Sequence, residues 1–509
     1  MKKKIVIAIM GFVLLGVTEM FAQIPTYSEE ALLFSRIQPG GSARIRGMGG
    51  VQNSLGGDVS SAYYNPAGLG MYNHSDFSIT PGYSINNSSS SYLGNNSADS
   101  KTSLIIPNLG IAFQSKKNGN KGLLAGTFGI NFNRTNSFNN TFSYQGTNND
   151  NSIIDYFINN ANGTGVSQFD SNNPPGYNRN TPTGLAYNNY LIGPQNILSP
   201  SAPADQYFTD VSGIPLQAET VKTTGAQNQW SFSYGVNFLD KIFVGAGLGL
   251  TSFRYKSEST YTETFNDPTQ PMSRMQLDET LSLSGSGINA TIGAIVRPVD
   301  QFQFGLSIAT PTGYLITDNY NATMNTSWKN NFEYVPGTKL GNESDNTDVV
   351  TSNYNISTPW RFSGGLTYFF GKKGFISADA EWLNYGNAKF SSSTGDDWSA
   401  DNKKIKGLYQ STLNIRVGGE YRYNNYRFRA GYSIMPDPFQ TQQNGIDRSL
   451  SSFSGGLGYR VSNFYVDFAA VFGQGSSSYR PYTVNSSTSP LVILNNKATS
   501  FIFTIGFPF

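Results

Sequence analysis

Several segments alternate aromatic or aliphatic residues with polar ones, and charged residues occupy some of the polar positions. In TLNIRVGGEYRY, Leu413 and Ile415 share one parity, whereas Arg416 and Glu420 share the other. Successive side chains of a strand point to opposite faces, so these charges gather on one face. The whole set is Arg361, Asp379, Glu381, Arg416, Glu420, Arg422, Arg427, Arg429 and Asp467. Such mixed charges usually form an ion-pair lattice; the alternative is that one or two unpaired arginines bind the carboxylate of an amphipathic ligand.

The sequence offers little for catalysis. His74 is the only histidine and stands in NHSD beside Ser75 and Asp76. A catalytic triad is a spatial arrangement, and adjacent residues in a strand diverge, so this run does not predict one. The absence of cysteine excludes disulfides, thiolate zinc sites and thiol nucleophiles. We therefore expect no enzyme activity, no catalytic residue and no cofactor.

Acidic pairs in predicted loops are the remaining candidates for a metal site. Asp345 with Asp348, and Asp396 with Asp397, have the oxygen ligands that calcium prefers. Solvated loops carry such pairs more often than metal sites do, so we expect no metal.

Residues 23–74 are rich in glycine and lack strand alternation. YSEEALLFSR predicts a short helix with Ser28 as its N-cap. In YYNPAGLG, Pro66 fixes its own φ and biases Asn65 toward an extended conformation. One interpretation is an Asn-Pro turn before the first strand. The other is a hatch that fills the interior of a barrel, since glycines permit close packing.

From residue 75 onward the apolar residues recur with period two, which is typical of half-buried strands. We predict fourteen strands, at residues 75–85, 103–114, 123–133, 227–238, 242–256, 281–296, 301–311, 357–370, 374–386, 409–423, 426–435, 451–461, 464–474 and 498–509. In the sixth, Leu281 and Leu283 have the opposite parity to Ile288 and Ile292, which predicts a bulge at Gly285 to Gly287.

The connections between these strands alternate strictly between short turns and long loops. Outer-membrane barrels place short turns in the periplasm and long loops outside, so the pattern predicts an all-β, 14-stranded antiparallel transmembrane β-barrel comprising residues 75–509. An even strand number also predicts that both chain ends lie in the periplasm. The longest loop, residues 134–226, is either solvated or a folded lid with a short helix at IIDYFI.

Composition and the two ends of the chain agree with this assignment. Charged residues are only 13% and aromatic residues 14% of the chain, and no basic stripe suggests nucleic acid. Residues 1–22 have three lysines and a short apolar core, which predicts a signal peptide cleaved near Ala22. The last strand ends at Phe509 and resembles the C-terminal signal read by the barrel-assembly machinery.

ARIRGMGGVQNSLGGDVSSAYYNPAGLG, residues 43–70, resembles the N-terminal hatch of the FadL/TodX family of outer-membrane transporters. The resemblance implies a 14-stranded barrel, a hatch at residues 23–74 with Asn65, Pro66 and Ala67 as its motif, and long outer loops. It also implies uptake of hydrophobic molecules such as long-chain fatty acids or aromatic hydrocarbons. In the family, a kinked third strand forms a lateral opening near the hatch. The predicted third strand here, LLAGTFGINFN, contains no proline.

We therefore expect a monomeric, passive transporter in a bacterial outer membrane. Its partners would be hydrophobic small molecules, outer-membrane lipid and the barrel-assembly machinery, and substrate would leave sideways into the membrane. Two alternatives stay open: a protein-binding barrel of a secretion system similar to PorV, and an adhesin or structural barrel.

Overall fold

The computed structural model describes residues 26–116, 122–169, 177–197, 203–329, 331–392, 395–485 and 488–509. The predicted signal peptide lies outside these ranges. No helix within them is long and apolar enough to cross a bilayer.

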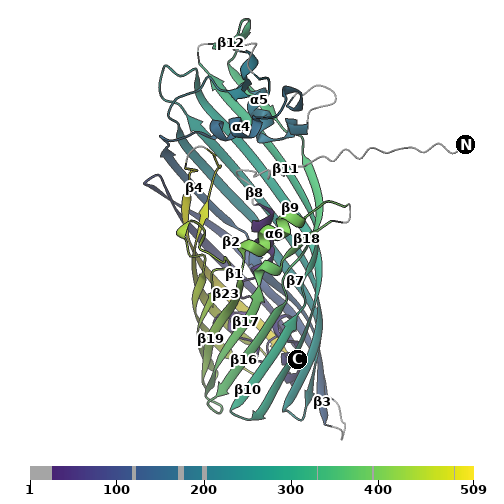
Figure 1. Ribbon diagram of the computed structural model, residues 1–509. Coiled ribbons are helices and arrows are strands. Elements are labelled where there is room, and N and C mark those ends of the chain that lie inside the picture. The colour runs from purple at the N-terminus through teal and green to yellow at the C-terminus, as the bar shows by residue number, and fades with distance from the viewer. Residues whose placement is uncertain are drawn as a thin grey trace, which may run out of the picture.

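Fourteen strands form a closed antiparallel barrel, as predicted (Figure 1). They are β1 (Asp76–Tyr92), β2 (Asn95–Lys116), β3 (Leu123–Ser137), β7 (Leu216–Phe238), β8 (Ile242–Thr264), β9 (Met272–Val299), β10 (Phe302–Ala309), β16 (Arg361–Phe369), β17 (Gly374–Asn384), β19 (Ser411–Tyr423), β20 (Tyr426–Met435), β21 (Leu450–Arg460), β22 (Tyr465–Tyr479) and β23 (Val492–Pro508). Each pairs with the next, and β23 pairs with β1 from Asp76–Pro508 to Ser91–Ile493. Closure pairs the edge groups that an open sheet would leave free in lipid.

Outward side chains of the lower barrel, the part that carries the short turns, form an apolar band. On β7, for example, Trp230 and Tyr234 are 41% and 46% exposed, and on β8 Leu248 is 56% exposed. The inward residues between them are polar or small, such as Ser231 and Ser233, which are buried. This arrangement is the reverse of a soluble protein and suits a hydrocarbon solvent outside.

Above the band lies the upper region, built from strand extensions and long loops. Its elements are β4 (Asn140–Thr147), α4 (Ile153–Ala161), α5 (Pro182–Asn188), β5 (Gly193–Pro194), β6 (Tyr207–Phe208), β11 (Gly313–Trp328), β12 (Glu333–Val335), β13 (Thr338–Lys339), β14 (Asn342–Asn346), β15 (Val350–Ser357), β18 (Lys389–Ser391) and α6 (Ser399–Leu408). The helix expected at IIDYFI is present as α4, capped by Ser152. Ile153 and Phe157 of α4 are fully buried in a large apolar core, so the described part of the longest loop is folded.

Strand β9 passes through both regions and shows how they differ. Leu281 and Leu283 are 2% and 1% exposed, whereas Ile288 and Ile292 are 55% and 56% exposed. The predicted bulge at Gly285 to Gly287 is wrong, because the β8–β9 register runs without a shift from Ile242–Val296 to Thr264–Arg274. The apolar face changes sides because the interior is apolar above the band and the exterior is apolar at the band.

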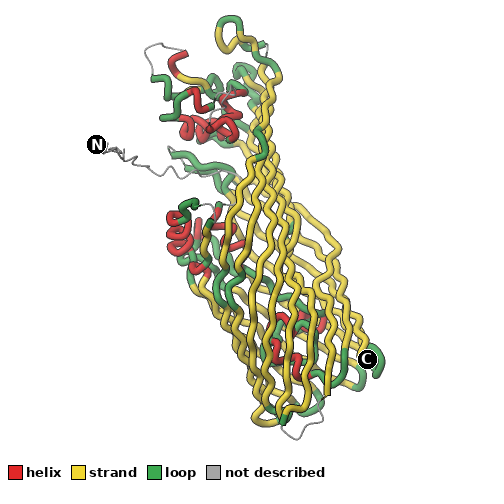
Figure 2. Tube along the Cα trace, turned by 90° about the vertical axis from the view of Figure 1, so that its right-hand side faces the viewer, coloured by secondary structure: helices red, strands yellow, loops and turns green. Residues whose placement is uncertain are grey.

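The N-terminal part of the chain runs down the interior of the barrel (Figure 2). Helix α1 (Tyr27–Ser35) packs in the upper core, with Phe34 against Phe253 at 4.4 Å between ring centroids. Its N-cap is Thr26, whose backbone N–H donates to Glu29 at 2.9 Å; the predicted cap Ser28 lies inside the helix. The C-terminal strand ends among the short turns, but α1 lies in the upper region. The expectation that both ends share the short-turn side is therefore wrong for the N-terminal part.

Residues 36–75, here called the inner segment, continue from α1 toward the short turns. They form α2 (Ala43–Arg46), α3 (Ser61–Tyr64) and the 3₁₀ helix η1 (Pro66–Met71), and then enter β1. Figure 2 shows these short helices enclosed by the strands of the lower barrel. Most residues of the segment are buried, although few are large and apolar.

Candidate functional site

The Asn-Pro-Ala motif is held against a patch of inward glycines on the barrel wall. Asn65 is fully buried and extended at φ −147°, as expected before Pro66, and its Oδ1 accepts from the backbone N–H of Ala67 at 3.2 Å. Its Nδ2 donates to the Asn53 carbonyl at 2.6 Å and to the Leu306 carbonyl of β10 at 3.3 Å. The Asn65 amide thus joins two parts of the inner segment to the wall.

Two glycines make this approach possible. A Cβ at Gly293 of β9 would overlap Oδ1 of Asn65, and one at Gly245 of β8 would overlap the backbone of Pro66. Both positions face inward, and Gly245 pairs directly with Gly293. The wall is therefore shaped to the motif, since any side chain at these positions would push η1 away.

Backbone groups of the inner segment also bind side chains of the barrel. Asp379 accepts the N–H groups of Gln52 and Asn53 at 2.6 and 2.8 Å through Oδ2. Elsewhere, the Ala43 N–H donates to Thr504 at 2.8 Å and the Gly41 N–H donates to Asn133 at 2.8 Å. Asp379, one of the predicted inward charges, thus binds backbone N–H groups of the inner segment and anchors it to the wall.

Most of the other predicted interior charges form ion pairs. Glu420 lies 2.8 Å from Arg422, 2.8 Å from Arg429 and 3.6 Å from Arg44. Arg429 also binds Asp467 at 2.7 Å, and this carboxylate lies 3.6 Å from Arg460. In a second group, Glu381 binds Arg416 at 3.0 Å and accepts from Asn414 at 3.0 Å.

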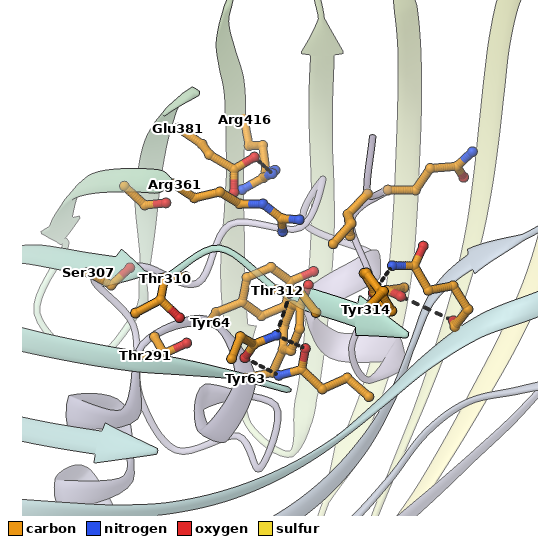
Figure 3. Close-up of a pocket in the computed structure, with 18 residues that line it drawn as sticks. Tyr63, Tyr64, Thr291, Ser307, Thr310, Thr312, Tyr314, Arg361, Glu381 and Arg416 are labelled. Atoms are coloured by element: carbon orange, nitrogen blue, oxygen red, sulfur yellow. Dashed lines mark hydrogen bonds and ion pairs between the residues drawn. The ribbon is translucent and has the colours of Figure 1, made fainter. Parts of the chain in front are cut away.

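Two of the predicted arginines stand apart from this lattice. Arg427 donates to the carbonyls of Asn424 and Tyr426 in its own turn, at 2.7 and 2.8 Å. Arg361, at the start of β16, forms no ion pair within 4.0 Å among the described residues. It lines an internal pocket, and Figure 3 shows it beside the Glu381–Arg416 pair and close to Tyr63 and Tyr64.

This pocket lies at the boundary between the two regions of the molecule. Its lining includes Tyr63 and Tyr64 of the inner segment, Arg361, Gln229 and Tyr314, and its volume is about 50 Å³. Tyr314 belongs to the upper apolar core, whereas Arg361 belongs to the polar interior. The cavity is close to the volume of one or two water molecules, so a larger ligand requires side chains or the inner segment to move.

Strands β2 and β3 stop pairing with each other halfway up the barrel wall. Their pairing runs from Lys116–Ala125 to Asn108–Asn133 and stops there. Beyond that point, within the described part of the chain, β2 pairs only with β1, and β3 pairs only with β7. Pro107 stands at the end of the shared ladder and has no N–H to donate. The exposed side chains of Leu104 and Ile106 place this seam within the apolar band.

The inner side of the seam is polar and touches the inner segment. Asn108, Asn131 and Asn133 are fully buried, and one amide atom of each has no hydrogen-bond partner among the described residues. The Gln38 N–H donates to the Thr135 carbonyl of β3 at 3.1 Å, just beyond the last β2–β3 pair. The predicted third strand contains no proline; the β2–β3 ladder instead ends beside Pro107 of β2, and β3 is bound there by the inner segment.

The remaining candidates from the sequence do not form a site. Asp76 accepts from Tyr465 at 2.9 Å, and His74 is exposed at the short-turn end, 6.3 Å from the Tyr72 ring. Asp345 pairs with Arg179 at 2.9 Å, and Asp397 accepts from the Ser399 N–H at 2.9 Å. The described part of the chain contains no group of three histidine or acidic residues that could hold a metal.

Of the comparisons with known proteins, only the one with solved structures finds a match. No family model matches the sequence, and no curated protein matches it. Among solved structures, a FadL homologue from Pseudomonas aeruginosa superposes with a TM-score of 0.56 at 13% identity, over 93% of this chain and 99% of that one. The toluene transporter TodX from P. putida gives a TM-score of 0.51 at 12% identity, over 92% and 99%. The chain has the FadL fold.

Within this FadL fold, sequence reasoning missed Arg44, Arg460, Tyr63 and Tyr64. Arg460 ends the predicted strand 451–461 on its inward parity, so the parity rule could have found it. Arg44, Tyr63 and Tyr64 lie in the aperiodic inner segment, where no parity applies. The inward glycines were also a usable signal, because Gly235, Gly245, Gly293 and Gly305 recur at polar positions of successive strands.

Proposed function

We propose that this protein is a passive outer-membrane transporter of hydrophobic compounds, and that it favours amphipathic molecules with a carboxylate, such as long-chain fatty acids. The observation that carries the proposal is a barrel of the FadL fold whose interior is filled by the inner segment and whose wall is interrupted beside that segment. An open pore would pass polar solutes, whereas a filled barrel with a seam in its apolar band favours lateral release. One of the two superposed structures is named a toluene transporter, which agrees with a hydrophobic substrate.

The route we propose follows the change in polarity along the interior. An apolar chain would partition into the upper core, around residues such as Phe34, Phe253 and Tyr314. The head group would then reach the pocket at Arg361. Movement of residues 36–41 would release β3 at Thr135 and let the substrate leave between β2 and β3 into the membrane. The amide atoms along the seam that have no partner among the described residues support this step, because unsatisfied buried polar groups make the closed state less stable.

Arg361 is the group we assign to the carboxylate. The buried arginines Arg44, Arg416 and Arg429 already form ion pairs with Glu420, Glu381 or Asp467. A guanidinium binds a carboxylate through two parallel hydrogen bonds, and hydrogen bonds to charged groups contribute about 1.5–3 kcal/mol each. The Asn65, Pro66 and Ala67 motif and Asp379 would hold the inner segment in place and do not contact the substrate in this proposal.

The test is uptake and binding of labelled oleate, compared with a neutral hydrocarbon of similar length. In a bacterial host without its own fatty-acid transporter, the wild-type chain should restore oleate uptake. Arg361→Gln should weaken oleate binding by about tenfold or more while leaving hydrocarbon binding unchanged. Arg427→Gln is the matched control, since Arg427 donates to the Asn424 and Tyr426 carbonyls of its own turn and lies away from the pocket. Failure of the wild type to support uptake would overturn the proposal, and equal loss for both ligands would remove Arg361 from its assigned role.

A further inference from the structure

Four exposed lysines lie at the short-turn end of the barrel. Lys116 ends β2, Lys241 lies in the β7–β8 turn, and Lys372 and Lys373 form the β16–β17 turn. None of them has a carboxylate within 4.0 Å in the described part of the chain. Their ammonium groups are therefore available to a partner.

The arginines at the same end are engaged within the protein. Arg297 donates to Gln303 at 3.2 Å and lies over the ring of Phe243 at 5.9 Å. Arg422 and Arg460 bind Glu420 and Asp467 and also lie over aromatic rings. This contrast separates the four exposed lysines, which form no ion pair in the described part of the chain, from the arginines that stabilise the barrel.

A large exposed apolar side chain lies within three positions of each of these lysines, at the edge of the apolar band. Phe113 precedes Lys116 by three positions and is 45% exposed, Leu239 precedes Lys241 by two and is 63% exposed, and Phe370 precedes Lys372 by two and is 48% exposed. Apolar anchors beside long cationic side chains are the arrangement found at a membrane–water interface, where the stem lies on apolar surface and the charge reaches the head groups.

The distribution of the lysines around the barrel points to lipid as the partner. The four lysines lie within a run of eight consecutive neighbouring strands out of fourteen, which are β2, β3, β7, β8, β9, β10, β16 and β17. Charges spread over nearly half of the circumference face different directions. A surrounding lipid layer meets all of them, whereas one globular partner would meet only some.

We propose that Lys116, Lys241, Lys372 and Lys373 bind the phosphates of anionic phospholipids in the leaflet at the short-turn end. This proposal rests on the proposed function only in placing the barrel in a membrane. Anionic lipid surfaces attract such side chains by roughly fivefold per lysine, and the attraction falls within a Debye length as salt rises. Lipids bound there would fix the depth and tilt of the barrel in the membrane from its short-turn end.

The test measures lipid retained by the intact, purified protein. After reconstitution in phosphatidylcholine vesicles with and without phosphatidylglycerol, the wild type should retain phosphatidylglycerol preferentially in native mass spectrometry. A variant with all four lysines changed to glutamine should lose at least fivefold of that preference, and high salt should mimic the loss. The matched control changes Lys403, Lys404 and Lys406 of α6, which are also exposed but lie in the upper region, and should retain the lipid.

Several outcomes would overturn the proposal. The wild type would show no preference for phosphatidylglycerol, or the variant without the four lysines would keep that preference. The α6 variant would lose the preference to the same extent, or the four lysines would capture an acidic periplasmic protein instead of lipid. Thermal unfolding of both variants verifies that they fold. Because lipid retention is measured without any transport substrate, its result and that of the oleate assay are independent of each other.

Discussion

The lower barrel and the upper region are built from the same strands, yet they place apolar residues on opposite sides. On β9, Ile292 faces outward in the apolar band and Leu283 faces inward in the upper core. The backbone register does not change between them. The difference shows that the solvent on each side of the wall, and not the strand itself, decides which face is apolar. The crossover between Gly285 and Ile288 marks the level at which lipid gives way to water.

The sharpest way to test this contrast is to truncate one apolar side chain in each region of β9. Leu283→Ala removes side-chain atoms from a close-packed core and should destabilise the upper region by about 2–5 kcal/mol. Ile292→Ala faces a fluid solvent that fills the space, so we expect a much smaller loss. Equilibrium unfolding in vesicles, followed by tryptophan fluorescence, measures both. Equal losses would contradict the assignment of a protein core on one side and lipid on the other.

A smaller effect, of about 1–3 kcal/mol, is expected where the wall meets the inner segment. Gly293→Ala places a methyl group against Asn65, whereas Gly364→Ala on β16 meets only Leu306 at 3.6 Å. The first variant should loosen the inner segment and raise ion conductance in a planar bilayer, and the second should leave conductance unchanged. The interpretation of the segment as a hatch fails if neither variant conducts more than the wild type.

The smallest effect concerns pH and is confined to the upper region. Burial raises the pKa of Glu219 from 4.5 to about 7 and that of Glu279 to about 8, although tyrosine hydroxyls donate to both. A raised carboxyl pKa stabilises the folded state fully below about pH 4.5, and this contribution is lost as pH rises through 7 to 8. Upper loops should therefore be cleaved faster by protease at about pH 9 than at about pH 5.

The rate of cleavage should be taken relative to an unstructured peptide, which corrects for the protease's own pH dependence. Glu219→Gln together with Glu279→Gln should flatten the profile, because a neutral amide does not titrate. The same pH dependence in this double variant would exclude these carboxyl groups as its cause. The lower barrel should resist cleavage at both pH values.

The fourteen barrel strands could be predicted because lipid imposes a period-two pattern over each crossing. Their upper ends could not. The strand predicted at 281–296 spans 272–299, and the one predicted at 227–238 begins at Leu216. Above the band the apolar residues change to the other face of the strand. A prediction that follows apolar residues on one face therefore ends where the face changes, although the strand continues. The inversion on β9 was visible in the sequence and was interpreted as a bulge.

The alternation of inward and outward positions along each strand also assigned the charged residues to the interior, but it did not show which residues they contact. It could not separate Arg361 from Arg416, since both are arginines on the inward parity of their strands. Their difference is the ion pair that Arg416 forms with Glu381 and that Arg361 lacks among the described residues, and parity alone does not show which side chains come within reach. The end of the β2–β3 ladder could not be predicted from strand parity either. It depends on the path of residues 36–41 as much as on Pro107.

The passage of the inner segment through the whole interior has a consequence for assembly. The segment leads directly into β1, and β1 closes the barrel against β23, more than four hundred positions away in the sequence. Once that ladder has formed, α1 could reach the upper region only by threading through a finished ring. The segment must therefore already lie inside the open sheet when the β1–β23 ladder forms. Closure of β1 on β23 would then be the final and slowest step of folding, as expected for the contact of highest sequence separation.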